Sequence, residues 1–325
     1  MTFILIYSII SLLLITALLI YFRIADRFNI IDKPNHRSSH KHITIRGGGV
    51  IFIIGALLYT LFFGLTLPYF IIGLTLISVI SFVDDVWDLS SLVRIIVHFV
   101  AMMLMFYDCG LYSLPWYYLV TALVVSTGII NAYNFMDGIN GITGGYSLVA
   151  MGSFWWINNH IHPFIDNNLL YVIAISLIVF NFFNFRKRAR CFAGDVGAVS
   201  IAFIIVFLLG KLIAETGNPS FIIILMLYGV DSILTIIHRL ILKENIFQAH
   251  RKHLYQIMSN ELKVPHTSVS LIYMVVQGVI MVGYFVFMNL YPSVSPWIYF
   301  LAVATILAGV YVWFMKRYFK MHIKD

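Results

Sequence analysis

Residues 71–88 read IIGLTLISVISFVDDVWD, an apolar run that ends in three carboxylates, Asp84, Asp85 and Asp88. Acids are rare in such a setting because a charge at the centre of a bilayer costs about 2.5–3.5 kcal/mol. On a helix Asp88 would share a face with both Asp84 and Asp85, so the carboxylates can converge. Converging carboxylates repel, and a divalent cation such as Mg²⁺ relieves that repulsion. The alternative interpretation is a solvated Asp cluster that ends the helix.

The composition places this cluster in a membrane protein. The chain has 325 residues, of which 61% are hydrophobic and 11% are charged, and its mean hydropathy is +0.93. Such values are typical of a polytopic membrane protein and not of a soluble core. The sequence has no Pro-rich or Gly/Ser-rich linker, so we expect one catalytic domain over residues 1–325. The net charge of +7 could suggest nucleic acid, but the basic residues lie in short loops, which membrane orientation explains without a nucleic-acid partner.

Apolar runs of about 17–25 residues predict membrane-spanning helices. We expect eleven, at residues 2–22, 47–67, 69–83, 91–107, 114–134, 138–158, 169–185, 197–214, 220–241, 268–288 and 295–315. The first run lacks a basic segment before it and a small-residue cleavage site after it, so it is expected to be retained and not removed as a signal peptide.

The Lys and Arg residues predict the orientation, because loops on the cytoplasmic side are enriched in them. They gather in alternate loops, at Arg23, Arg27, Lys33, Arg37, Lys41, Arg46, Arg94, Arg186, Lys187, Arg188, Arg190, Arg239, Lys243, Arg251, Lys252, Lys263, Lys316, Arg317, Lys320 and Lys324. With eleven spans and the N-terminus outside, all of these fall on the cytoplasmic side, as does the C-terminus. Lys211 alone falls near the outer end.

This orientation puts every polar motif on the same side of the membrane. The cytoplasmic ends of the predicted spans carry all of them: the three aspartates of residues 84–88, the segment 131–141, Asp195 and the histidines of residues 250–253. A transporter more often keeps ionisable groups near the midplane, on broken helices. An enzyme that joins a water-soluble substrate to a lipid headgroup needs them at headgroup depth.

The segment 131–141 combines carboxamides, a carboxylate and glycines. Asn134 and Asp137 belong to a polar row with a three-residue spacing, and Gly138 allows a close approach of the backbone. Such groups suit the base, ribose and phosphates of a nucleotide. A polar turn between helices, with glycine for packing, is the structural alternative.

Phe192 and Asp195 precede the predicted eighth span. A carboxylate at a helix start is also what capping produces. Together with the Asp84 cluster, however, Asp195 could share a Mg²⁺ ion that bridges a diphosphate. Phe192 could stack on a base, although aromatic residues are common at membrane interfaces.

The loop with His250, Arg251, Lys252 and His253 carries positive and titratable groups. Zinc is disfavoured because the two cysteines, at positions 109 and 191, fall on opposite sides and cannot complete a site. A phosphate-binding or acid–base role is favoured over an ordinary basic loop only in combination with the other motifs. Asp231 is the deepest predicted acid, and we expect it to pair with a neighbouring helix or to support the site.

A basic segment, 32–40, precedes Arg46 and the glycines Gly47, Gly48 and Gly49. The glycines would let backbones pack closely as the second span begins. The basic residues could bind anionic headgroups in general or hold the phosphate of one lipid substrate.

Taken together, the sequence resembles the polyprenyl-phosphate N-acetylhexosamine-1-phosphate transferases, and the resemblance covers nearly the whole chain. It rests on an ordered set of motifs: Asp84-Asp85 with Asp88, Asn134-Phe-Met-Asp137-Gly138, Phe192-Ala-Gly-Asp195, Asp231, and His250-Arg-Lys-His253-Leu-Tyr255-Gln256. Within the family, the histidine loop and Arg46-Gly-Gly-Gly are most similar to the branch that initiates surface polysaccharides. The peptidoglycan translocase branch instead carries adjacent histidines in that loop.

The resemblance implies an all-α, eleven-span enzyme of the bacterial inner membrane with its active site facing the cytoplasm. It would move a sugar 1-phosphate from a UDP-N-acetylhexosamine to undecaprenyl phosphate. It implies the following roles: catalytic residues Asp84, Asp85 and His250; Mg²⁺ ligands Asp195 and Asp84, with Mn²⁺ as the alternative ion; substrate contacts Asn134, Asp137, Phe192, Arg46, Arg251 and His253. Partners would be the two substrates and the bilayer, and a homodimer is left open.

Two positions depart from the family pattern. Asn140 stands where many bacterial members have Asp, and Ile45 stands where a Pro is usual. The former leaves the preferred sugar open, together with the polysaccharide it would enter. The alternatives at this stage are the peptidoglycan translocase and, from another class, a transporter or lipid flippase. A phosphatidyltransferase is disfavoured because its further acids are missing downstream of Asp137-Gly138.

Overall fold

The computed structural model describes residues 2–33, 42–87, 89–246 and 250–318. Asp88 and most of the basic segment 32–40 therefore lie outside the described residues. The long helices are α1 (Thr2–Arg27), α2 (Val50–Phe63), α3 (Pro68–Val86), α4 (Ser91–Asp108), α5 (Trp116–Met136), α6 (Ile142–His160), α7 (Asn167–Asn184), α8 (Gly194–Thr216), α9 (Met226–Ile241), α11 (His266–Leu290) and α12 (Pro296–Tyr318). Shorter elements are β1 (Ile31–Asp32), β2 (Thr44–Ile45), η1 (Leu111–Ser113), η2 (Pro219–Leu225), α10 (Leu254–Gln256) and η3 (Ile257–Glu261).

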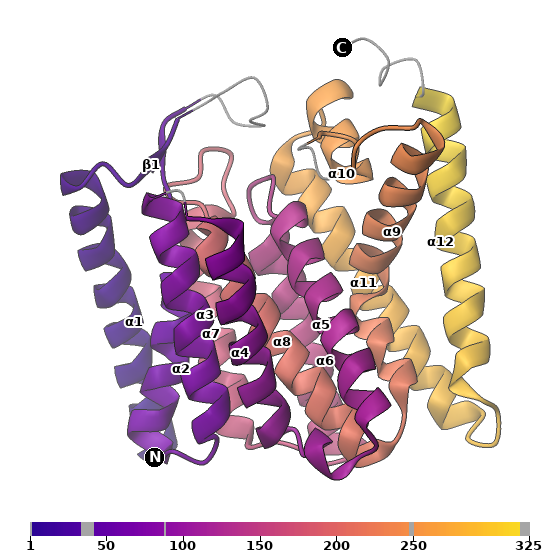
Figure 1. The fold of residues 1–325 in the computed structure, drawn as a ribbon, viewed down its shortest axis with the longest axis horizontal. Coiled ribbons are helices and arrows are strands. Elements are labelled where there is room, and N and C mark those ends of the chain that lie inside the picture. The colour runs from indigo at the N-terminus through magenta and orange to yellow at the C-terminus, as the bar shows by residue number, and fades with distance from the viewer. Residues whose placement is uncertain (1, 34–41, 88, 247–249, 319–325) are drawn as a thin grey trace.

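The helices form one upright bundle, as the all-α membrane class predicts (Figure 1). Among the described residues, nine helical segments are long and apolar enough to cross a membrane. Helix α2 is apolar but shorter, and α6 is not among the nine. The class is thus confirmed, while the number of eleven spans and the orientation in the membrane remain predictions. The start of α1 and the end of α12 lie at opposite ends of the bundle (Figure 1).

Helix α8 is the centre of the bundle. In the most apolar stretch of α8, 83% of the residues are buried inside the protein. The corresponding share is 17% in α1 and in α12, at the two edges of the bundle. Helix α8 packs on α2, α3, α5 and α6. An all-round apolar sequence predicts such a fully surrounded helix. Its first turn, which carries Asp195, is thereby fixed relative to the end of α3, which carries Asp84 and Asp85.

The predicted ninth span, 220–241, is not one continuous α-helix. It begins as the 3₁₀ segment η2 and becomes α-helical only at Met226. The buried side chain of Gln277 on α11 satisfies the break, because its amide donates to the carbonyl of Ile223 at 2.9 Å and its oxygen accepts from the amide of Leu227 at 3.2 Å. Irregular backbone at membrane depth is tolerated where another part of the protein supplies such partners. The sequence did not predict this break, because the residue that satisfies its backbone groups, Gln277, is far away in the chain.

The glycines after Arg46 bring two loops into backbone contact. The amides of Gly48 and Gly49 donate to the carbonyls of Phe192 and Ala193, at 2.8 Å and 3.0 Å. A Cβ on Gly49 would lie 2.1 Å from the Cα of Gly197, so a larger residue cannot fit. The prediction that these glycines allow close packing at the start of the second span is confirmed. Their consequence is that Arg46 is held beside the first turn of α8.

We expect Gly49→Ala to lower the melting temperature of the purified protein strongly, because its methyl group would push against the backbone of Gly197. The control is Gly152→Ala in α6, where an added Cβ meets nothing within 4 Å. There alanine should be neutral or stabilise by about 0.5–1 kcal/mol through helix propensity. Thermal unfolding of both variants in the same detergent measures the difference. Equal melting temperatures would contradict the close approach.

Candidate active site

Helix α3 ends with two carboxylates that point to different partners. Asp84 accepts hydrogen bonds from the backbone amide of Leu89 at 3.0 Å and from Arg94 on α4 at 2.5 Å. Asp85, whose side chain is 0% exposed, accepts from the backbone amides of Asp195 and Val196, each at 3.0 Å. Those two amides belong to the first turn of α8, which leaves its N–H groups free to bind an anion. Asp85 therefore joins the end of α3 to the start of α8.

Arg46 lies between Asp85 and Asp195. Its Nε is 2.6 Å from Oδ1 of Asp85, and its Nη2 is 3.5 Å from Oδ1 of Asp195. Burial disfavours the charge of Arg46, but the two carboxylates outweigh that effect, and the pKa of Arg46 is raised above its ordinary value. The hydroxyl of Tyr21 on α1 donates to the carbonyl of Arg46 at 2.6 Å and fixes the backbone there. Three segments far apart in sequence thus meet at one guanidinium group.

Asp137 completes the charged group from the end of α5. It is half-buried, and it interacts electrostatically with Asp195, Asp85 and Arg46. Burial, reinforced by the charges of Asp195 and Asp85, raises the pKa of Asp137 to about 7, against a smaller opposing effect of Thr143.

We call Asp84, Asp85, Asp137 and Asp195 with Arg46 and Arg94 the acid cluster. When all its carboxylates are ionised, four negative charges face two positive ones, which leaves an excess of two negative charges.

The acid cluster offers the kind of donor that Mg²⁺ prefers. Its free groups are carboxylate oxygens, and the side chain of Asp195 is 26% exposed, so it can be reached from solution. Over the described ranges, no set of three or more His, Cys, Asp or Glu residues forms a complete metal cage. Mg²⁺ does not need one, because it is commonly held by one or two carboxylates together with waters and substrate phosphates. The residues present therefore fit such an ion.

The residues predicted to face a nucleotide lie around the acid cluster. Asn134 is one turn before Asp137 on α5. Phe192 is partly exposed in the loop before α8, where its amide donates to the carbonyl of Ile45 at 2.8 Å. Asn140 is buried, and its amide donates to the carbonyl of Arg186 at 2.8 Å. An Asp at position 140 could not donate that hydrogen bond, so the departure from the family pattern has a structural reason: it ties down the basic loop 186–190.

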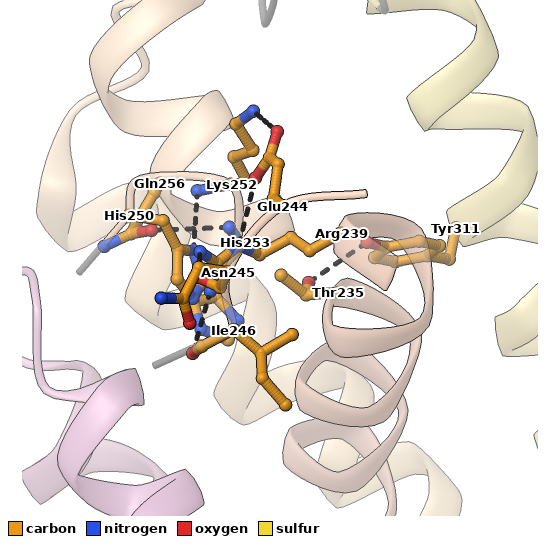
Figure 2. Close-up of polar contacts among 10 residues, drawn as sticks. All are labelled: Thr235, Arg239, Glu244, Asn245, Ile246, His250, Lys252, His253, Gln256 and Tyr311. Atoms are coloured by element: carbon orange, nitrogen blue, oxygen red, sulfur yellow. Dashed lines mark hydrogen bonds and ion pairs between the residues drawn. The ribbon is translucent and has the colours of Figure 1, made fainter. Parts of the chain in front are cut away.

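Arg239, a buried residue near the end of α9, contacts the segment that leads into the histidine loop (Figure 2). Arg239 pairs with Glu244 at 3.1 Å and donates to the carbonyls of Asn245 and Ile246. Glu244 also pairs with Lys252. Glu244 thus links Arg239 to Lys252, whose backbone amide donates to Nδ1 of His250 at 3.3 Å (Figure 2).

The two histidines of this loop have different surroundings. Burial, followed by the proximity of His253 and Arg239, lowers the pKa of His250 to about 3, so the ring of His250 is neutral at neutral pH. A group with so low a pKa is a poor general base and fits a hydrogen-bonding role better. His253 is 3% exposed, lies 3.4 Å from Asp231 and caps α10. Its contacts here are with the protein, so the substrate contact predicted for it, like that of Arg251, remains a prediction.

Asp231 supports the histidine loop, as the sequence predicted for this deep acid. It accepts from the hydroxyl of Tyr273 on the neighbouring α11 at 2.6 Å and from the amide of Leu254 at 3.0 Å. Tyr255, which follows Leu254 in α10, contacts the segment 131–141, because its hydroxyl donates to the carbonyl of Phe135 at 2.8 Å. A Cβ on Gly138 would lie 2.3 Å from that hydroxyl. Gly138 is thus required by the packing of Tyr255, which connects the histidine loop to the turn that carries Asp137.

Sequence analysis missed three residues of the site. Arg94 was used only to predict the orientation. A basic residue at the start of one span, soon after an acid at the end of the previous span, indicates an ion pair, and here Arg94 pairs with Asp84. Arg239 was also used only to predict the orientation, and its burial could not be seen in the sequence. Tyr255 was quoted as part of a motif without a role, because its partners at positions 135 and 138 are distant in the chain.

We expect Asp137→Asn to stabilise the metal-free protein at pH 8 but not at pH 4. The folded protein keeps a proton on Asp137 up to about pH 7, whereas the unfolded chain loses it near the ordinary pKa of 3.8. Stability therefore falls as the pH rises from about 4 to 7 and then levels off. The neutral Asn avoids this loss. Melting temperatures across that range, with the exposed Asp26→Asn as control, measure it; a constant difference between Asp137→Asn and wild type would contradict the raised pKa.

Comparison with known proteins agrees with these features. The family model described as glycosyl transferase family 4 matches residues 67–212. A probable undecaprenyl-phosphate N-acetylglucosaminyl 1-phosphate transferase of Bacillus subtilis (strain 168) is 26% identical over 77% of this chain and 75% of its own length.

Two further relatives are named undecaprenyl-phosphate alpha-N-acetylglucosaminyl 1-phosphate transferase. The protein from Yersinia pestis is 26% identical over 73% of this chain and 71% of its own length. The protein from Escherichia coli (strain K12) is 28% identical over 62% of this chain and 61% of its own length. The matched family region contains Asp84, Asp85, Asn134, Asp137 and Asp195. The resemblance seen in the motifs is confirmed: residues 67–212 match glycosyl transferase family 4, and most of the chain is similar to these N-acetylglucosaminyl 1-phosphate transferases.

Proposed function

We propose that this protein transfers an N-acetylhexosamine 1-phosphate from its UDP derivative to undecaprenyl phosphate. The products are undecaprenyl-diphosphate-sugar and UMP. The enzyme acts at the cytoplasmic face of a bacterial inner membrane and supplies the first intermediate of a surface polysaccharide. The names of the relatives support the acceptor and the type of transfer. N-acetylglucosamine is the sugar in those names, and the donor of this chain is to be found by experiment.

The observation that carries the proposal is the meeting of four carboxylates with only two guanidinium groups in the acid cluster, at one end of an apolar bundle. Carboxylates crowded beside a bilayer are costly unless something binds there. An excess of two negative charges matches one divalent cation, and a cation held on oxygen ligands is what a diphosphate substrate needs. The neighbouring histidine loop and basic loop 186–190 supply positive and hydrogen-bonding groups for phosphates.

The reaction forms one bond and breaks one bond. An oxygen of the acceptor phosphate attacks the sugar-bearing phosphorus of the UDP-sugar, and the bond from that phosphorus to the bridging oxygen breaks, so that its electron pair leaves with UMP. Asp195 and Asp84 would hold the ion, with Asp85 and Arg46 keeping Asp195 in position. Bound Mg²⁺ would supply charge neutralisation for the diphosphate and for the departing UMP.

A general base is not required for this attack. A phosphate monoester has a second pKa of about 6, so the acceptor is mostly dianionic at neutral pH. Asp84, paired with Arg94, is therefore better suited to hold the ion or orient the acceptor than to remove a proton. Much of the acceleration would come from holding the two substrates in line. Asn134, Asp137 and Phe192 would face the nucleotide, and His250 and Arg251 the sugar phosphate.

The test is UMP release by the purified protein with undecaprenyl phosphate, Mg²⁺ and a panel of UDP-N-acetylhexosamines. We expect release that requires both lipid and Mg²⁺. Asp195→Asn should lower kcat by about 10²–10³-fold, the usual loss when one electrostatic group is removed from a transition state. Asp26→Asn, at an exposed carboxylate on α1 outside the acid cluster, should retain wild-type activity.

The outcomes separate the classes of function. A transporter or lipid flippase would release no UMP with any donor, and equal activity of Asp195→Asn and wild type would remove Asp195 from the site. Release only with UDP-MurNAc-pentapeptide would indicate the peptidoglycan translocase reaction instead.

Tyr255→Phe tests the connection between the histidine loop and the turn at Asp137. The variant loses the hydrogen bond to the carbonyl of Phe135, which contributes about 0.5–1.5 kcal/mol, while the ring still packs on Gly138. We expect a several-fold rise in the KM for the UDP-sugar, an unchanged KM for undecaprenyl phosphate and little loss of thermal stability. A change in kcat with no change in either KM would argue against this positioning role.

A further inference from the structure

A polar cavity lies at the end of the bundle opposite to the acid cluster. Its volume is about 400 Å³. Sites for small ligands typically measure about 300–1,000 Å³. The cavity is formed by the end of α4 with the turn that follows, and by the last turns of α8. Its lining comprises Tyr107, Asp108, Cys109, Gly110, Ser113, Leu114, Lys211, Ala214 and Glu215. None of these residues takes part in the proposed transfer.

The cavity presents charges of both signs with spare bonding capacity. Lys211 pairs with Glu215 at 2.9 Å, which uses one of the three N–H groups of its ammonium. Glu215 also faces His162 at 3.6 Å. Asp108 accepts from the backbone amide of Phe70 through Oδ2 at 2.7 Å, and its other oxygen remains to accept from a ligand. A cation able to bind phosphate and an anion able to bind an ammonium group thus line the same space.

The charge balance at this end selects against an anionic ligand. Among the described residues, Lys211 is the only Lys or Arg here, whereas Asp108, Asp166 and Glu215 are all at this end. Acidic residues therefore outnumber Lys and Arg among the described residues at this end. A ligand with a phosphate alone would be repelled, and one with a phosphate and an ammonium group would meet a partner for each.

A second, apolar crevice adjoins the cavity through Tyr107. Its volume is about 230 Å³, and its other lining residues are Tyr69, Phe99, Val100, Met103, Leu104 and Tyr112. Exposed aromatic side chains mark the same level: Tyr107 is 57% exposed and Trp116 is 73% exposed. Tyr and Trp gather at membrane interfaces, so the cavity lies at headgroup depth. The crevice runs from there along α3 and α4, where an acyl chain would be.

We propose that this cavity and crevice together bind one zwitterionic phospholipid with a primary amine headgroup, of the phosphatidylethanolamine class, in the leaflet opposite to the acid cluster. Lys211 binds the phosphate, Asp108 binds the ammonium group, and one acyl chain occupies the crevice beside Tyr107. The site is independent of the proposed transfer, and it would fix the turn between α4 and α5 against the end of α8.

The first test measures lipid selectivity of the wild-type protein, purified and delipidated in detergent, by native mass spectrometry. The probes are phosphatidylethanolamine, phosphatidylcholine and phosphatidylglycerol with identical acyl chains. We expect phosphatidylethanolamine to be retained at least about fivefold more than phosphatidylglycerol. Phosphatidylcholine should be intermediate, since its trimethylammonium group carries no N–H for Asp108. Equal or stronger retention of phosphatidylglycerol would overturn the proposal. The readout does not depend on UMP release.

Single substitutions then assign the two contacts. Asp108→Asn keeps an acceptor for the amide of Phe70 and should abolish the preference for phosphatidylethanolamine over phosphatidylcholine. Lys211→Gln should lower the retention of both phosphatidylethanolamine and phosphatidylcholine severalfold. The matched control, Lys263→Gln, changes an exposed lysine at the other end of the bundle and should behave as wild type. Wild-type selectivity in both cavity variants would overturn the proposed site. A variant that fails to fold leaves the wild-type comparison to decide.

Discussion

The contact of Arg46 with Asp85 and Asp195 is the interaction on which the site depends. Asp85 is fully buried, and a buried carboxylate without partners would be strongly destabilising. It is accepted here because two backbone amides of α8 and one guanidinium group share its charge. Since Arg46 follows β2, Asp85 ends α3 and Asp195 begins α8, one small set of charges fixes three segments.

The apolar bundle makes those charges both costly and effective. Helix α8 is surrounded by other helices, so the hydrogen bonds that the fully buried Asp85 accepts at its first turn act in a low dielectric and are stronger than in solution. The same condition disfavours the ionised carboxylates of the acid cluster, and the raised pKa of Asp137 is the result. A protein stabilised mainly by apolar packing can carry such an unbalanced site, because its helices are held by many contacts elsewhere. In the proposed function, a bound divalent cation would offset the cost of the crowded carboxylates.

The histidine loop is a second unit, built on a different principle. It lies at the same end of the bundle but is organised by Asp231 and Arg239 of α9, with Tyr311 of α12 joined through Thr235 (Figures 1 and 2). Tyr255 connects it to the turn at Gly138. A substrate that contacts both units would therefore meet two parts of the site that the hydrogen bond of Tyr255 connects. Sequence motifs spread over more than a hundred residues become a single surface in this way.

The sequence by itself determined the class of fold, the position of nearly every helix and the residue types of the site, because apolar runs and the cost of charges within them are local properties. The break before α9 was not predictable, since a side chain on α11 satisfies it. Only the tertiary structure decided which partner each acid has: Arg94 for Asp84, Arg46 and two amides for Asp85, and Tyr273 for Asp231. Several of those partners are remote in the chain, and a charged group is recognised in sequence by its type but acquires its chemistry from the distances and burial that folding sets.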